Sequence, residues 1–163
     1  MVPTERITAV NRAPIRLDAD YVLYWMIATR RPHCNFALQR DVEHAVRMAK
    51  PLVVLKPLRA GHRWANARIN QFAVDGMRDN ALGFQRAGVR YHPYLECRAG
   101  DGRGLLAALA TRAAVVVTDE FPCFFLPAMV AAAGNALPVC LESVDSNGLL
   151  PLRADSGPHA TAY

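Results

Sequence analysis

The chain has 163 residues, of which 52% are hydrophobic and 20% charged, a balance typical of one globular domain with its own core. Its longest apolar run, residues 124–133, is shorter than the roughly 20 residues that a membrane span needs, and Glu5 and Arg6 interrupt the apolar stretch that a signal peptide requires. The sequence therefore favours a cytoplasmic protein without a membrane partner, and its net charge of +5 is compatible with a phosphate-rich partner.

Apolar runs and helical periodicities alternate from residue 20 onward. Residues 1–19 contain two prolines and show no period, so they are predicted to form an irregular leader. The predicted elements that follow are, in chain order, a strand at 21–27, a helix at 36–48, a strand at 51–55, a helix at 64–87, a strand at 89–92, a helix at 105–112, a strand at 114–117, a helix at 125–133 and a strand at 138–141. This order predicts an α/β fold with a doubly wound, Rossmann-like sheet of five parallel strands.

The ends and faces of the helices can also be predicted. Asn35 is placed to cap the helix at 36–48, and Gly88 and Gly134 are expected to end two later helices. The expected core stripe of the first helix contains Leu38, Val42, Ala45 and Val46. The expected core stripe of the longest helix contains Ile69, Phe72, Val74, Met77, Ala81 and Phe84.

Residues 20–152 are predicted to form the domain, and residues 153–163 have the composition of a linker. The four cysteines form no C-x-x-C pair and are expected to be free thiols. The histidines show no metal-ligand spacing, so no metal site is predicted.

Candidate ligand-binding residues follow two of the predicted strands, at the edge of the sheet where open α/β folds bind ligands. Arg30 and Arg31 could clamp a phosphate or carboxylate, brace a neighbouring domain, or be exposed without a fixed role. Asp119 and Glu120 could cap the next helix or accept hydrogen bonds from a ligand. The glycine-rich segment 100–104 lacks the spacing of a phosphate-binding loop, so a turn is favoured there.

Five segments in order resemble the N-terminal α/β domain of DNA photolyases, closest to class II cyclobutane pyrimidine dimer photolyases. They are residues 24–38 (with Tyr-Trp-Met, Arg-Arg and Asn-Phe-Ala-Leu), 51–55, 63–77, 115–119 and 144–151. The resemblance covers roughly residues 20–152. It departs from the family pattern at 27–33, where no acidic residue precedes the arginine, and at 120–125.

The resemblance implies part of a deoxyribodipyrimidine photolyase, a carbon–carbon lyase that repairs DNA in light. It further implies an antenna pigment in this domain (a deazaflavin, a folate or FMN), FAD in a separate helical domain after residues 153–163, and DNA contact through the full-length protein. No catalytic residue is expected, and the chain alone is expected to be inactive in repair. The cofactor-binding residues that the resemblance implies are Met26, Thr29, Arg30, Arg31, Asn35, Lys56, Asp119 and Glu120.

Three alternatives stay open at this point. The departures at 27–33 and 120–125 lie at strand ends, where a pigment would sit, so the pigment could be changed or absent. The chain could instead be a stand-alone nucleotide-binding α/β protein. It could also be an interaction module for a separately encoded helical partner.

Overall fold

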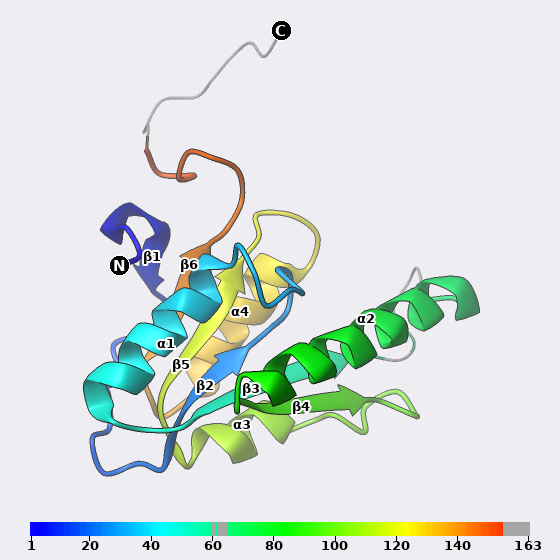
Figure 1. Cartoon of the computed structure of the whole chain (residues 1–163), viewed down its shortest axis with the longest axis horizontal. Coiled ribbons are helices and arrows are strands. Elements are labelled where there is room, and N and C mark those ends of the chain that lie inside the picture. Colours follow the sequence, from blue (N-terminus) through cyan, green and yellow to red (C-terminus); the bar gives the residue numbers. More distant parts are fainter. Residues whose placement is uncertain (60, 62–64, 155–163) are drawn as a thin grey trace, which may run out of the picture.

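The computed structural model describes residues 1–59, 61 and 65–154, and these form one sheet with helices on both faces (Figure 1). The sheet order is β1-β6-β5-β2-β3-β4. The strands are β1 (Ile7–Ala9), β2 (Tyr21–Trp25), β3 (Leu52–Leu58), β4 (Arg90–Leu95), β5 (Ala113–Glu120) and β6 (Leu141–Asp145). The helices are α1 (Phe36–Met48), α2 (Ala67–Arg86), α3 (Leu105–Ala110) and α4 (Leu126–Ala136), and a 3-10 turn, Thr4–Arg6, precedes β1.

The predicted α/β fold class is confirmed. Strands β2 to β6 run parallel to one another, and a helix connects each to the next in the chain. Side chains alternate between two apolar layers, as they must on a strand whose successive side chains point to opposite faces. Leu23 and Trp25 of β2 pack in the layer under α3 and α4, whereas Val22 and Tyr24 pack in the layer under α1 and α2.

The sheet has six strands rather than the five predicted, because the leader contributes β1. Within residues 1–19, Ile7–Ala9 pair antiparallel with β6, in the register Ile7↔Val144, Thr8↔Ser143 and Ala9↔Glu142. Three residues are too short for a periodic signal, so this strand depends on a partner more than 130 residues away in the sequence. It covers an edge of the sheet that would otherwise expose the backbone of β6.

The prediction for the last strand was wrong. It was expected at residues 138–141 and lies at Leu141–Asp145. The polar residues Glu142 and Ser143 are buried in this strand because β1 and α1 cover β6. A prediction based on runs of apolar residues therefore places the strand too early in the sequence. Strand β3 also runs past its predicted end, through Pro57. Since β2 stops at the partner of Leu55, Pro57 has no β2 neighbour and its missing N–H breaks no bond to β2.

Two helix faces differ from their predicted stripes. In α1, Val42 and Val46 are 43% and 76% exposed, whereas Ala37, Asp41 and His44 are buried. In α2, Met77 and Phe84 are buried as predicted, but Ile69 and Phe72 are 47% and 81% exposed. Figure 1 shows the amino-terminal turns of α2 reaching beyond the sheet, which leaves no layer there to cover them.

Helix ends follow their local signals in part. Asn35 caps α1, and Gly88 has the left-handed backbone (φ +67°) that ends a helix. Gly134 does not end α4, which continues to Ala136. A side chain at this position would meet Val10 Cγ1 at 2.7 Å, so glycine serves close packing of the leader instead. The predicted helix start at Trp64 and the linker beyond residue 154 lie outside the described residues.

Candidate ligand site at the carboxyl edge of the sheet

The carboxyl ends of β2 and β5 lie side by side at the point where the chain connections diverge. From β2 the chain first adds β3 and β4 on one side and then β5 and β6 on the other. In open α/β sheets the crevice at such a switch point is the usual ligand position. The predicted site residues Thr29 and Asp119 meet at this point.

Asp119 is fully buried and holds the loop after β2. Its Oδ2 accepts hydrogen bonds from the backbone N–H groups of Ile27 (2.8 Å), Ala28 (2.8 Å) and Thr29 (3.1 Å). Its Oδ1 accepts one from the Tyr24 hydroxyl (2.6 Å). Burial raises the pKa of Asp119, while these hydrogen bonds oppose the rise. The carboxylate is therefore engaged by the protein's own loop.

Asn35 has a similar structural role, and its predicted capping function is confirmed. Its Oδ1 accepts from the Leu38 N–H at 2.9 Å, the first-turn bond of an N-cap. Its Nδ2 donates to the Tyr24 hydroxyl (2.9 Å) and to the carbonyl oxygens of Thr29 (3.1 Å) and Arg31 (3.0 Å). Asn35 thus joins α1 to the loop that precedes it.

The two arginines of this loop are exposed. Arg31 donates from Nε and Nη2 to the Cys34 carbonyl oxygen, at 3.3 and 3.1 Å, and so closes its own turn. Arg30 donates from Nε to the Ile27 carbonyl oxygen at 3.4 Å, and its own carbonyl accepts from Asn80 Nδ2 of α2 at 3.0 Å. The backbone of Arg30 is therefore fixed between the loop and α2.

Lys56 lies at the end of β3 and is only 1% exposed. Its Nζ donates to the Pro57 carbonyl oxygen at 2.9 Å. Burial, followed by the charge of Arg30, lowers the pKa of Lys56 to about 7, and Asp119 opposes this. Burial raises the pKa of the neighbouring Tyr91 hydroxyl to about 12, and a side-chain interaction with Asn80 and the charge of Arg30 oppose this rise. Two basic side chains and a buried hydroxyl therefore gather where β3 and β4 meet the loop.

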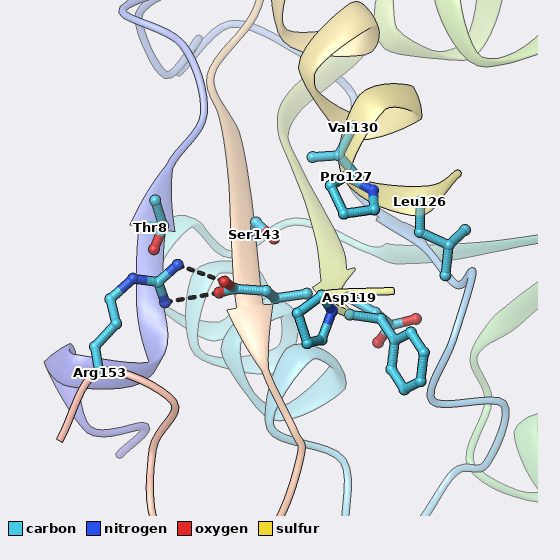
Figure 2. Close-up of a pocket in the computed structure, with 10 residues that line it drawn as sticks. Thr8, Asp119, Leu126, Pro127, Val130, Ser143 and Arg153 are labelled. Atoms are coloured by element: carbon cyan, nitrogen blue, oxygen red, sulfur yellow. Dashed lines mark hydrogen bonds and ion pairs between the residues drawn. The ribbon is translucent and has the colours of Figure 1, made fainter. Parts of the chain in front are cut away.

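The remaining predicted residues are separated from this group. Met26 is completely buried in the core layer under α1 and α2. Glu120 points to the other face of the sheet and forms two hydrogen bonds with Arg153. Asp119 and Glu120 also line a cavity of about 410 Å³ on the α4 side (Figure 2). The predicted set thus divides between two faces.

The sequence analysis missed a layer of buried polar side chains beneath α1. His44 Nε2 and Arg40 Nε lie 2.9 and 2.7 Å from Glu142 Oε2, and Arg40 Nη2 donates to the other oxygen. Burial alone favours neutral Glu142, but the hydrogen bonds from Arg40 and His44 outweigh it and lower the pKa to about 2. The sequence did carry one indication of this layer, because Asp41 and His44 are three residues apart in the predicted helix and therefore lie on the same face.

Asp41 of the same layer is fully buried, and neither of its carboxyl oxygens has a hydrogen-bond partner within the described residues. Burial, and then the charges of Glu142 and Asp119, raise the pKa of Asp41 well above its ordinary value. The folded protein therefore favours the neutral form of Asp41, and this preference costs free energy as the pH rises above the ordinary carboxyl pKa.

We expect Asp41→Asn to stabilise the protein at pH 7 and to have little such effect near pH 4. Because the pKa of Asp41 is raised in the folded state, the wild type loses no stability at pH values below the pKa of the unfolded chain. As the pH rises from there towards the folded-state pKa, the free energy of unfolding of the wild type falls by up to about 1.4 kcal/mol per pH unit. Urea unfolding between pH 4 and 8 measures the difference. A difference between the variant and the wild type that does not change with pH would contradict the neutral assignment.

Two backbone amides of the glycine-rich segment are bonded to a side chain of the protein itself. Glu96 Oε1 accepts from the N–H groups of Gly100 (2.7 Å) and Gly102 (3.4 Å), so an internal carboxylate occupies these donors. Over the described residues, no three histidine, cysteine or acidic side chains gather as a metal site would require, and all four cysteines are free thiols. None of the described helices combines the length and apolar character needed to cross a bilayer.

Comparison with known proteins finds a sequence similarity to a photo-lyase. The chain is 32% identical over 156 residues to the deoxyribodipyrimidine photo-lyase of Methanothermobacter thermautotrophicus. The match covers 96% of this chain and 34% of the relative, so the chain spans about a third of that protein's length. It supports a photolyase-like α/β domain. No family model matches the sequence.

Two solved structures of the universal stress protein family are similar in fold. One, from Archaeoglobus fulgidus and in complex with dAMP, has 15% identity and a TM-score of 0.48, over 75% of this chain and 97% of the other. The other, from Burkholderia pseudomallei, has 20% identity and a TM-score of 0.41, over 74% of this chain and 95% of the other.

Proposed function

We propose that this chain is the antenna-pigment domain of a deoxyribodipyrimidine photolyase, which repairs cyclobutane pyrimidine dimers in DNA with light. The observation that carries the proposal is the 32% identity to a photo-lyase over 96% of the chain. In the proposed protein, FAD and the DNA-binding groove belong to a helical domain beyond this chain. The α/β domain supplies a pigment that absorbs light and passes the excitation energy on.

The proposed pigment position is the carboxyl edge of the sheet between the loop after β2 and the end of β3. Thr29, Arg30 and Lys56 would hold the pigment there. Lys56 is buried beside Arg30, and this mutual repulsion favours an electron-rich or anionic group between them. The buried hydroxyl of Tyr91 lies in the same charge environment and could donate a hydrogen bond to that group.

In this arrangement Asp119 and Asn35 are positioning residues. Five hydrogen bonds hold the backbone from Ile27 to Arg31, three from backbone amides to Asp119 Oδ2 and two from Asn35 Nδ2 to backbone carbonyl oxygens. The Tyr24 hydroxyl connects the two side chains. A loop fixed in advance binds a ligand without the entropy cost of ordering.

The segment after β6 supports the proposed contact with a helical domain. Asp145 Oδ2 accepts from the Leu152 N–H (2.7 Å), and Arg6 Nη2 donates to the Leu149 carbonyl oxygen (2.8 Å), so this segment is tied to the body. Yet Leu149 and Leu150 are 98% and 76% exposed. Leucines held outwards on a fixed loop are typical of an interface.

The first test is the absorption spectrum of the purified chain, before and after addition of a deazaflavin, a folate or FMN. We expect one pigment to bind with a dissociation constant of about 1 μM. Lys56→Met should weaken that binding at least tenfold. Arg112→Gln is the control, because Arg112 forms an exposed ion pair with Asp20 at the opposite end of the sheet. This variant should bind the pigment as the wild type does. No binding of any of the three pigments would overturn the antenna proposal.

The second test addresses the partner. We expect this chain, co-expressed with the remaining two-thirds of the Methanothermobacter photo-lyase, to co-purify with it. A Leu149→Asp, Leu150→Asp double variant should lose that association while keeping the melting temperature of the isolated chain. Retention of the complex by this variant would place the interface elsewhere.

A further inference from the structure

A second groove lies on the face of the sheet opposite Lys56. It has a volume of about 410 Å³ and runs over the carboxyl halves of β5 and β6, between β1 and α4 (Figure 2). Lys56 lies at a strand position that points its side chain towards α1 and α2, whereas Glu120 and Ser143 point towards α4. The groove therefore opens on the other face of the sheet from Lys56, and Asp119, which holds the loop after β2, also lines it.

Two hydroxyl groups form the floor of the groove. Thr8 and Ser143 are direct cross-strand partners on β1 and β6, so their side chains lie next to each other on one face. Ser143 is only 6% exposed. Thr8 is half-buried, and neither hydroxyl oxygen is among the buried unpartnered side-chain atoms of the described residues, so both oxygens are open to the groove. A ligand with polar atoms could hydrogen-bond to both hydroxyls.

The rim carries one charge of each sign. Arg153 donates to both carboxylate oxygens of Glu120, with Nη1–Oε2 at 2.7 Å, as Figure 2 shows. Because the pair neutralises itself, the groove offers no free charge to bind a phosphate or a carboxylate. The pair still presents a donor and an acceptor edge to a ligand.

The opposite wall is apolar. Leu126, Pro127 and Val130 of α4 line it, and Phe121 and Pro122 continue it on the loop after β5. Aliphatic side chains of this kind pack against the flat face of a ring, and ligand sites commonly combine such a wall with a few polar groups.

We propose that this groove is a second ligand site and that it takes an uncharged nitrogen heterocycle of nucleoside size. The ring would pack on Leu126 and Val130, and its polar edge would meet the hydroxyls of Thr8 and Ser143. The charge-balanced rim selects against a net anion, since a phosphate would have to displace Glu120 from Arg153.

Adenosine and AMP are suitable probes, titrated into the isotope-labelled full chain and followed by amide chemical shifts. We expect adenosine to give saturable shifts at Thr8, Ser143 and Val130 with a sub-millimolar dissociation constant, and AMP to bind at least fivefold more weakly. Equal or tighter binding of AMP would overturn the proposal, as would shifts confined to the loop at 27–31 or no saturable shift at all.

Variants separate the hydroxyls from the apolar wall. A Thr8→Val, Ser143→Ala double variant keeps the shape of the floor and should weaken adenosine binding at least fivefold. Leu126→Trp should block the groove, and since Leu126 is partly exposed, the melting temperature should change little. Thr111→Val, at an exposed hydroxyl beyond α3, is the matched control and should bind as the wild type does. Unchanged binding in both groove variants would overturn the assignment.

Discussion

Asp119→Ala is expected to lower the free energy of unfolding by about 4 kcal/mol. The substitution leaves three backbone N–H groups and the Tyr24 hydroxyl without their acceptor in a buried place. Each unpaired buried donor costs roughly 1–3 kcal/mol, and relaxation of the loop towards water recovers part of this. The loss should also release the loop from Ile27 to Thr29.

Urea unfolding at pH 7, followed by circular dichroism, measures this effect. Glu120→Ala is the matched control, because the neighbouring carboxylate is partly exposed and its pair with Arg153 lies at the surface. Surface pairs contribute about 0–1 kcal/mol, so the control should change stability by less than 1 kcal/mol. Equal effects of the two variants would show that Asp119 does not hold the loop.

Lys56→Met is expected to raise the free energy of unfolding by about 3 kcal/mol at pH 7. Lowering the pKa of this buried lysine from 10.5 to about 7 costs the folded state about 4 kcal/mol there. The substitution removes this cost, but it also removes the hydrogen bond from Lys56 to the Pro57 carbonyl oxygen, which lowers the net stabilisation by about 1 kcal/mol.

The gain should depend on pH with a defined sign. Above pH 10.5 Lys56 is neutral in both the folded and the unfolded chain, so its burial costs no stability there. As the pH falls from 10.5 towards about 7, the unfolded chain takes up the proton first, and the free energy of unfolding of the wild type decreases. The wild type should therefore lose stability relative to Lys56→Met between pH 10 and pH 7, and the difference should be constant below pH 6. Unfolding curves at pH 6, 8 and 10 would contradict the prediction if the difference did not change.

This lysine also connects stability with the proposed function. Lys56→Met is expected both to stabilise the chain and to weaken pigment binding. A buried cation that costs stability and serves only binding is the trade-off expected at a ligand site. Stabilisation without any change in pigment binding would separate Lys56 from the site.

The sequence by itself determined the features that depend on neighbours a few residues apart. Alternating apolar runs and helical periods predicted the α/β order and both covered faces of the sheet, because burial imposes these periods on each element. The cap at Asn35 and the helix end at Gly88 were predicted for the same reason, since a side-chain acceptor and a left-handed backbone act within one turn.

Only the tertiary structure decided the features that depend on distant partners. Strand β1 forms because β6 offers an open edge. Glu142 lies on that same β6, and its bonds to Arg40 and His44 turn the polar side of α1 inwards. The partners of Asp119 were likewise invisible, since the loop that it binds lies 90 to 92 residues earlier. Desolvation and hydrogen bonding act through space, so the place of a polar side chain is known only once the sheet has assembled.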